Sequence, residues 1–404
     1  MKTLDGAVAA VVASGNCSGC GACTLLDDGL RMHLNEYGYA RPTRVAGTRG
    51  SRGDAAAFRK LCPGVGVAAA RPSGSRRHPT MGPHLGVWTV HASDAEVRRR
   101  GSSGGAITAI TTWLLERGEA AKVIGASADA VEPRRTVSVT LQSKEEVLAA
   151  AGSRYAPTSN ASVGAVRDAG AAVVGKPCEV AALRALASVT PGQHAPLLIS
   201  FFCAGTPSQH ATEKLLEFLG MPPLTPLREL WYRGRGWPGR FTAIATDGRT
   251  VSTDYDDSWG AHLGPTAQWR CKLCPDGVGE SADLVAADFW HTDDRGYPVF
   301  TESEGVSALV ARTARGLDVV ERAIAAGVIV AAPLHIDRLA AVQPLQRRRR
   351  QLLFARLLGA RLAGRTVPRY RGFGLLRLAL HRPMQAVRTA RGTYRRARET
   401  GVTP

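Results

Sequence analysis

The chain has 404 residues, of which 44% are hydrophobic and 21% are charged, a composition typical of a globular protein with room for about two or three domains. No apolar run approaches the roughly 18 residues of a membrane-spanning helix, and no secretory signal pattern is present. The formal net charge is +18, but residues 338–404 hold 17 arginines and a single acid, Glu399, which leaves only +2 on residues 1–337. The basic character therefore belongs to the tail and does not indicate a nucleic-acid-binding body.

The order of apolar runs predicts how the chain is organised. We expect a small cysteine-bearing unit over residues 1–70, a linker over residues 71–84, a core over residues 85–335, and an Arg-rich amphipathic helical tail over residues 336–404. Within the core, we predict strands over residues 85–91, 123–125, 136–141, 171–175 and 197–202, and helices over residues 106–117, 144–151 and 179–187. Strands that alternate with helices at this pitch predict an α/β fold with some α+β elements.

Eight cysteines fall into two sets of four. In the first set, Cys17, Cys20 and Cys23 are each separated by two residues, and Cys62 precedes a proline. Three thiolates at this spacing can surround one face of a [4Fe-4S] cluster, and a distant Cys-Pro can supply the fourth ligand. Structural zinc is the alternative, but zinc sites usually join two C-x2-C pairs. A disulfide framework is not expected in a long chain without an export signal.

The second set combines the isolated Cys178 and Cys203 with the pair Cys271 and Cys274. One C-x2-C pair and two separate cysteines suit a cluster and a zinc site about equally well. The spacing of this set therefore leaves both metals open.

Two turns rich in small residues are candidate cofactor sites. One precedes the helix predicted from residue 106, where backbone N–H groups and the helix N-terminus could hold a phosphate; the alternative is a simple N-cap turn. The other follows a helix end, where an arginine could pair with a phosphate and a tyrosine could stack on a ring; the alternative is a C-cap turn. The candidate residues of these turns are Ser102, Ser103, Gly104, Gly105, Gly152, Ser153, Arg154 and Tyr155.

Two further segments are less specific. Asp288 stands beside aromatic residues and could accept a hydrogen bond from a ribityl chain or a ring N–H, although a solvated turn acid is the commoner case. Residues 231–240, rich in Arg, Gly and Trp, are typical of a mobile cationic loop beside a site. No residue stands out as an acid–base catalyst.

Taken in order, these motifs resemble the coenzyme F420 hydrogenase/dehydrogenase beta subunit family over about residues 14–330. Its members include beta subunits of F420-reducing hydrogenases and formate dehydrogenases, and reductases of 7-hydroxymethyl chlorophyll a and vinyl chlorophyllide, all iron–sulfur flavoproteins with non-covalent FAD. The resemblance implies that both turns and Asp288 contact FAD, with Gly175, Lys176 and Pro177 nearby. It also implies that Cys178, Cys203, Cys271 and Cys274 hold the [4Fe-4S] cluster nearest the flavin, and that the first set holds a second [4Fe-4S] cluster.

The activity implied is electron transfer through two clusters to or from FAD, with hydride exchange between the flavin and coenzyme F420 or a small organic substrate. The expected partner is a ferredoxin-like protein, a hydrogenase or dehydrogenase subunit, or coenzyme F420 itself. Two alternatives stay open: an electron-transfer adaptor that serves a partner enzyme, and a zinc-stabilised, membrane-associated scaffold.

The tail has its own alternatives. Basic amphipathic helices over residues 345–398 are typical of segments that lie on anionic membrane surfaces. Docking to an acidic partner protein is the alternative, and nucleic acid is not expected. Reduced thiols without an export signal predict a cytoplasmic protein, with peripheral attachment to the inner face of the membrane as a further expectation.

Overall fold

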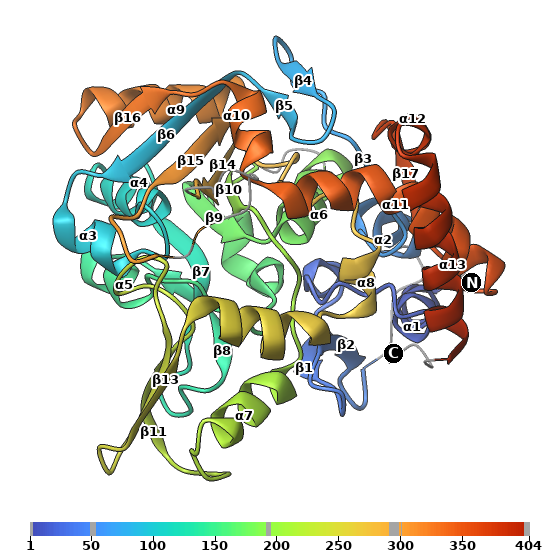
Figure 1. Ribbon diagram of the computed structural model, residues 1–404, viewed down its shortest axis with the longest axis horizontal. Helices are drawn as coiled ribbons and strands as arrows, with labels where there is room; N and C mark the ends of the chain where they lie inside the picture. The colour runs from blue at the N-terminus through green and yellow to red at the C-terminus, as the bar shows by residue number, and fades with distance from the viewer. Residues whose placement is uncertain (1–2, 49–53, 191–194, 291–298, 300, 400–404) are drawn as a thin grey trace.

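A mixed eight-stranded sheet forms the centre of the molecule (Figure 1). The structure, a computed structural model, describes residues 3–48, 54–190, 195–290, 299 and 301–399. The strand order is β16-β6-β15-β14-β10-β9-β7-β8. The strands are β6 Gly86–Ala92, β7 Lys122–Ala128, β8 Thr136–Leu141, β9 Ala171–Gly175, β10 Leu197–Phe201, β14 Leu284–Asp288, β15 Ser307–Ala311 and β16 Ile329–Pro333. The neighbouring strands β7, β9, β10 and β14 are parallel, and the outer pairings are antiparallel.

Helices cover both faces of this sheet, which explains why its central strands are almost wholly apolar. Successive residues of β10 show the two faces: Leu198 belongs to one buried cluster and Ile199 to the other. The Ile199 face packs against α4 Ala106–Glu116, α5 Lys144–Ala149 and α9 Ala314–Ala325, with α3 Ala95–Arg100 beside them. The Leu198 face packs against α6 Pro177–Val189. The α/β fold class predicted from the sequence is confirmed.

The N-terminal unit shares the core on the Leu198 face. Its Leu4 and Phe58 are buried in the same cluster as Val180 of α6. The unit comprises α1 Leu4–Ala13, η1 Ala22–Leu25, the hairpin β1 Leu30–Leu34 and β2 Ala40–Arg44, α2 Asp54–Leu61 and β3 Gly66–Ala68. Residues 71–84, predicted as a linker, contain the hairpin β4 Arg76–His78 and β5 Gly82–His84. Met81 is buried there because it packs against Val87 and Val278. The division into domains stays a prediction.

A small lobe lies below the sheet in Figure 1. Its three antiparallel strands and one helix enclose a separate core around Leu215, Tyr232 and Phe241. The elements are α7 Gln209–Phe218, β11 Leu227–Trp231, β12 Phe241–Ala245, β13 Thr250–Thr253, the π-helical segment η4 Asp257–Leu263, and the short η5 Gly264–Thr266. Two short 3-10 segments, η2 Asn160–Ser162 and η3 Gly164–Arg167, precede β9.

The C-terminal tail is largely helical, and it packs against the body. Its elements are α10 Ile336–Ala341, α11 Pro344–Leu362, β17 Arg369–Arg371, α12 Leu375–Leu380 and α13 Pro383–Glu399. Leu353 and Leu357 of α11 are buried against Leu273, next to α8 Trp269–Lys272. Strand β17 pairs with β3 of the N-terminal unit. Within the described residues, no helix combines the length and the apolar character needed to cross a membrane.

Candidate functional site

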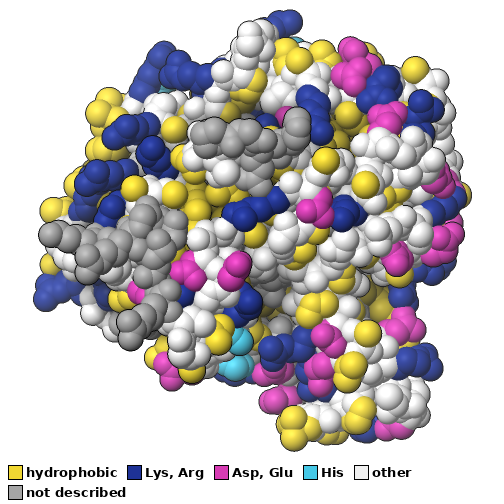
Figure 2. Space-filling view, turned by 180° about the vertical axis from the view of Figure 1, so that it is seen from behind, with side chains coloured by type: hydrophobic (Ala, Val, Ile, Leu, Met, Phe, Trp, Pro, Cys, Tyr) yellow, Lys and Arg dark blue, Asp and Glu magenta, His cyan; other side chains and the backbone are white. Residues whose placement is uncertain are grey.

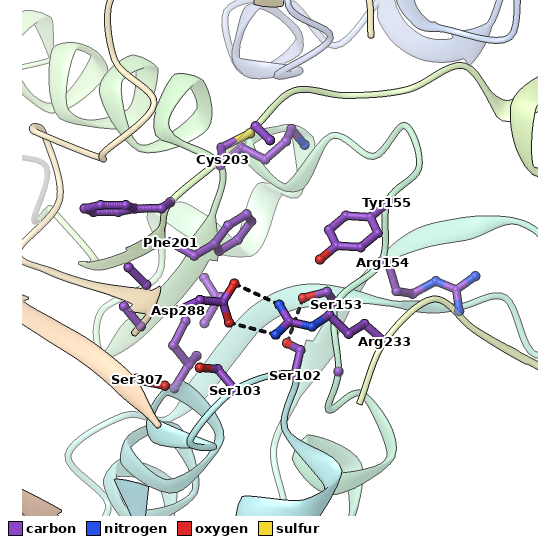
Figure 3. Close-up of a pocket in the computed structure, with 18 of the residues that line it drawn as sticks. Ser102, Ser103, Ser153, Arg154, Tyr155, Phe201, Cys203, Arg233, Asp288 and Ser307 are labelled. Carbon is purple, nitrogen blue, oxygen red and sulfur yellow. Dashed lines mark hydrogen bonds and ion pairs between the residues drawn. The ribbon is translucent and has the colours of Figure 1, made fainter. Parts of the chain in front are cut away.

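A cavity of about 720 Å³ opens at the carboxyl ends of the parallel strands. Its wall includes Val174 at the end of β9, Phe201 at the end of β10 and Asp288 at the end of β14. Open α/β sheets bind their ligands at this edge, and the volume lies within the range of small-molecule sites, about 300–1,000 Å³. The cavity is therefore the best-formed candidate site, and Figure 3 shows part of its lining.

The first predicted turn lies on the cavity wall, just before α4. Ser102, Ser103 and Gly105 line the cavity, whereas Gly104 packs against strand β6, where a Cβ would lie 2.5 Å from the carbonyl oxygen of Val90. Gly105, the N-cap residue just before α4, has a φ of +74°, a conformation that glycine adopts readily. The hydroxyls and the helix N-terminus beside the cavity suit an anionic group.

The second turn meets the first. The hydroxyl of Ser153 donates to that of Ser102 over 2.7 Å, and both point into the space drawn in Figure 3. Gly152 has a φ of +105°, and a Cβ there would lie 2.7 Å from the carbonyl oxygen of Arg233. Tyr155 packs against protein aromatics, with its ring centroid 4.9 Å from that of Trp259.

Arg154 also lines the cavity, but its donors are bonded to neighbouring protein groups. Its Nε donates to Thr136 Oγ1 over 2.8 Å, its Nη1 to the carbonyl of Leu230 over 2.7 Å, and its Nη2 to the carbonyl of Pro133 over 2.8 Å. Its guanidinium points away from the other labelled side chains in Figure 3. These hydrogen bonds connect the start of β8 to β11. The N–H donors of Arg154 are therefore already bonded to a hydroxyl and to backbone carbonyls.

Asp288 is paired with an arginine that the sequence did not single out. Arg233 donates from Nη1 and Nη2 to the two carboxylate oxygens of Asp288, over 2.8 and 2.9 Å. Its guanidinium lies 4.8 Å from the ring centroids of both Tyr255 and Trp290. Burial opposes the charge of Arg233, but Asp288 together with Tyr155 and Tyr255 raises the pKa of the guanidinium.

This pairing changes two sequence interpretations. The carboxylate of Asp288 accepts from Arg233, so the predicted acceptor for a ring N–H is already engaged by the protein. Residues 231–240 are not an open cationic loop, because Arg233 and Trp237 are each only 2% exposed. Nothing local in the sequence joins Arg233 to an acid 55 residues further on.

A buried ion pair on the cavity wall lies beside Cys178 of the second cysteine set. Lys176 lines the cavity and donates from Nζ to Glu179 Oε1 over 2.5 Å and to the carbonyl of Thr158 over 2.8 Å. Burial alone would lower the pKa of Lys176, but the charges of Glu179 and of the Cys178 thiolate raise it. Gly175 ends β9 and Pro177 begins α6, so the two residues flank Lys176 in this turn. Neither of them lines the cavity.

The first cysteine set surrounds a small apolar pocket. Cys17, Cys20, Cys23 and Cys62 all line a cavity of about 20 Å³ under α1 and α2. Burial raises the pKa of the Cys20 thiol to about 11. Burial and the neighbouring thiols also raise the pKa of Cys23 and of Cys62.

Side chains of the core hold the loops of this set. Gln268 donates to the carbonyl of Ser18 over 2.9 Å, Ser159 to that of Gly19 over 2.8 Å, and Arg270 to that of Pro63 over 2.8 Å. Arg270 precedes Cys271 and Pro63 follows Cys62, so one buried hydrogen bond joins the two cysteine sets.

The second set comes from separate elements that meet beside the cavity. Cys178 lies in the first turn of α6, Cys203 follows β10, and Cys271 and Cys274 lie in and just after α8. Burial raises the pKa of Cys203 to about 12. The neighbouring Cys271 also raises this pKa, whereas Arg349 lowers it. Cys203 itself lines the cavity.

Cys178 adjoins the first set. It packs against the buried cluster that contains Cys20, Cys23 and Cys62. Burial raises its pKa, Lys176 opposes the rise, and Cys20 adds to it. Among the described residues, no three Cys, His, Asp or Glu side chains are grouped closely enough to ligate a single metal ion. The assignment of all eight cysteines as cluster ligands stays a prediction.

The tail supplies contacts that the sequence interpretation missed. Arg349 of α11 donates from Nη1 to the carbonyl of Cys203 over 2.7 Å, and Gln346 donates to the same oxygen over 3.2 Å. Gln343 donates to the carbonyl of Asp288 over 2.7 Å. Arg350 pairs with the buried Glu280 over 2.7 Å. The tail therefore forms part of the site.

The fold and the site define an α/β protein with a ligand cavity beside two cysteine sets. Two sequence models of the coenzyme F420 hydrogenase/dehydrogenase beta subunit match the chain. The model of the N-terminal part matches residues 87–164, and the model of the C-terminal part matches residues 168–336. The chain belongs to the coenzyme F420 hydrogenase/dehydrogenase beta subunit family, which confirms the resemblance. Residues 337–404 lie beyond both matches.

Individual relatives are distant. The chain is 27% identical over 208 residues to the F420-dependent formate dehydrogenase 1 subunit beta of Methanococcus maripaludis, covering 50% of this chain and 52% of that protein. It is 25% identical over 253 residues to the coenzyme F420 hydrogenase subunit beta of Methanococcus voltae, covering 60% and 81%. The chain thus spans about half the length of the first relative.

A solved structure supports the fold. A chain of the F420-reducing [NiFe] hydrogenase complex from Methanosarcina barkeri aligns with a TM-score of 0.50 and 20% identity. The alignment covers 68% of this chain and 95% of that chain. At this identity the likeness concerns the fold alone.

Proposed function

We propose that the protein is an iron–sulfur flavoprotein oxidoreductase that passes electrons between two [4Fe-4S] clusters and FAD. The observation that carries the proposal is that the first cysteine set, the second cysteine set and the cavity adjoin one another in that order. Cys203 lines the cavity, and Cys178, from the same set, packs against the buried cluster that contains Cys20. A path for electrons from the first set to the cavity would then run past Cys178 and Cys203.

The residues present fit these cofactors. Four thiols in each set match the ligand number of a [4Fe-4S] cluster. The cavity offers the hydroxyls of Ser102, Ser103 and Ser153 near the N-terminus of α4 for an anionic group, and apolar side chains elsewhere on its wall. When bound, FAD supplies the conversion between the one-electron steps of clusters and the two-electron chemistry of organic substrates.

The protein's own groups would set the electrostatics of this site. Lys176, on the cavity wall beside Cys178, keeps its charge because Glu179 is its buried partner. Arg233 keeps its charge because Asp288 is its partner, and it orients the aromatic rings of Tyr255 and Trp290 at the cavity. Two fixed ion pairs beside the cavity would present preoriented dipoles to the cofactor, without a net positive charge.

The electron partner is proposed from the family. The first relatives are named as F420-dependent or coenzyme F420 enzymes, which supports coenzyme F420 as the candidate two-electron substrate. The same relatives are named as subunits, which supports the second candidate, an adaptor that serves a hydrogenase-type or dehydrogenase-type subunit or a ferredoxin-like protein. The third candidate is a small organic substrate that takes the place of F420.

Anaerobic reoxidation distinguishes these candidates. The protein is purified without oxygen, reduced, and mixed separately with F420, with a panel of small oxidised metabolites, and with an oxidised ferredoxin. Rapid return of the oxidised flavin spectrum with F420 or with one metabolite supports the enzyme. Reoxidation by the protein acceptor alone supports the adaptor. A purified protein without flavin contradicts the proposal.

A further inference from the structure

Helices α12 and α13 carry a row of exposed apolar side chains. The exposed fractions are 54% for Leu376, 67% for Leu380, 71% for Met384 and 60% for Val387. Leu376 and Leu380 lie one turn apart on α12, and Met384 and Val387 lie one turn apart at the start of α13, so each pair lies along one side of its helix. We call these four residues the apolar ridge.

Arginines flank the apolar ridge. Arg377, Arg382, Arg388 and Arg391 are all exposed, and residues 338–404 contain one carboxyl side chain, Glu399. Figure 2 shows Lys and Arg side chains gathered, with apolar ones between them, along the edge where Figure 1 draws α12 and α13. The surface is therefore both apolar and strongly cationic.

The apolar ridge borders the mouth of the cavity. Arg382, between Leu380 and Met384, lines the cavity together with Arg347 and Arg348 of α11. Leu345 also lines the cavity and is 51% exposed. The same edge of the molecule thus carries the exposed apolar side chains, the cationic side chains and the opening.

We propose that the apolar ridge docks on an anionic lipid bilayer and sets the cavity mouth at the lipid headgroups. A narrow apolar row between arginines suits the boundary between headgroups and acyl chains, where apolar burial and attraction to anionic lipid act together. Both family matches end before α11, so the docking surface is an addition to the shared body.

Vesicle sedimentation with the full-length, cofactor-loaded protein tests this proposal. The probes are vesicles of phosphatidylcholine alone and of phosphatidylcholine with phosphatidylglycerol.

The ridge variant carries Leu376→Ser, Leu380→Ser, Met384→Ser and Val387→Ser. Its matched control replaces four exposed apolar residues elsewhere with serine, namely Val131, Phe218, Leu224 and Val330, which are 92%, 68%, 88% and 51% exposed. The charge variant carries Arg377→Gln, Arg388→Gln and Arg391→Gln, and its control carries Arg228→Gln, Arg240→Gln and Arg249→Gln in the lobe.

The expected result is binding to the anionic vesicles, weak binding to the neutral ones, and weakening by added salt. The ridge and charge variants should each lose about tenfold or more in affinity, since burial and charge contribute separately. Both controls should bind as the unaltered protein does. Iron and flavin content confirm that each variant is folded, whatever its redox activity. Failure of the unaltered protein to bind anionic vesicles overturns the proposal, as does binding that the ridge variant leaves unchanged, or a ridge that captures an acidic protein and no lipid.

Discussion

The two cysteine sets differ in how the chain builds them. Three members of the first set lie within seven residues, and the set surrounds a small apolar pocket under two helices. The second set is assembled from separate elements and lies against the cavity, with Lys176 and Arg349 among the groups that lower the pKa of its thiols. The first site is thus defined by local sequence, and the second by tertiary structure.

This difference bears on the direction of electron flow. Net charge, hydrogen bonds and exposure set the reduction potentials of iron–sulfur clusters. Nearby positive charge stabilises an added electron, so we expect the second site to have the higher potential. Electrons would then run from the first site toward the cavity.

Replacing one ligand in each set should produce the largest contrast. We expect Cys20→Ser to lose about half of the iron and keep its flavin, because the two sites bind separate clusters. Cys203→Ser should also lose about half of the iron, and it should alter the flavin spectrum because Cys203 lines the cavity. Iron analysis and visible spectra of anaerobic protein measure both. Equal flavin spectra in the two variants would contradict the proposed difference.

The tail braces the second site through Glu280, which pairs with Arg77 and Arg350. Glu280→Gln leaves buried charge unpaired and should lower the free energy of unfolding at pH 7 by about 3–5 kcal/mol. The exposed pair of Glu119 with Arg322 is the matched control, and Glu119→Gln should cost at most about 1 kcal/mol. Urea unfolding followed by circular dichroism measures both values.

The effect of Glu280→Gln should depend on pH. Burial alone would raise the pKa of Glu280, but Arg350 and Arg77 outweigh burial and lower it. A carboxyl with a lowered pKa in the folded state stabilises the protein above its ordinary pKa, and that stabilisation is lost as pH falls through the folded-state value. The difference between the two proteins should therefore shrink in acid. A difference that grows in acid would contradict the assignment.

Replacing Arg233 tests whether flavin binding at the cavity depends on the bidentate pair of Arg233 with Asp288. Arg233→Lys keeps the charge but loses the planar fork and the stacking on two rings. We expect the flavin dissociation constant to rise about tenfold, which corresponds to about 1.4 kcal/mol. Arg235→Lys is the control, since Arg235 also lies over a tryptophan ring but is 41% exposed. Titration of the flavin-free protein with FAD measures both affinities, and equal effects would refute a specific role for Arg233.

Replacing Arg349 should have the smallest effect, a change in the reduction potential of the second site relative to the first. Arg349→Gln removes the cation that donates to the Cys203 carbonyl. The potential of the second site should fall by on the order of tens of millivolts, where about 59 mV is tenfold for one electron. The first site is the internal control, and Arg348→Gln is the control on the same helix. A redox titration followed by electron paramagnetic resonance measures both sites, and a shift confined to the first site would contradict the account.

Local patterns allowed much of the fold to be predicted. The strand predicted over residues 136–141 is β8, where apolar and hydroxyl-bearing residues alternate, and the one over residues 171–175 is β9, a short apolar run that ends in a glycine. The turn before α4 was located from its small residues, and three of them, Ser102, Ser103 and Gly105, line the cavity. Such features depend on neighbours in sequence, so one sequence suffices to indicate them.

Side-chain partners distant in sequence could not be predicted. Arg349 is 146 residues from the carbonyl that it contacts, and Arg233 is 55 residues from Asp288. An arginine-rich segment is usually a solvated surface, yet Arg349 and Arg350 are buried because carbonyl oxygens and Glu280 accept from them. Arg154 illustrates the converse, since backbone carbonyls occupy donors that the sequence had suggested for phosphate.

The most direct test of the redox account is the cofactor content of the full chain purified without oxygen. Two filled sites and one filled cavity predict about eight irons, about eight sulfides and about one FAD per chain, with a brown-yellow colour. About four irons with FAD would leave one cysteine set without its proposed role. A colourless protein that contains zinc, or one without flavin, would contradict the proposed function.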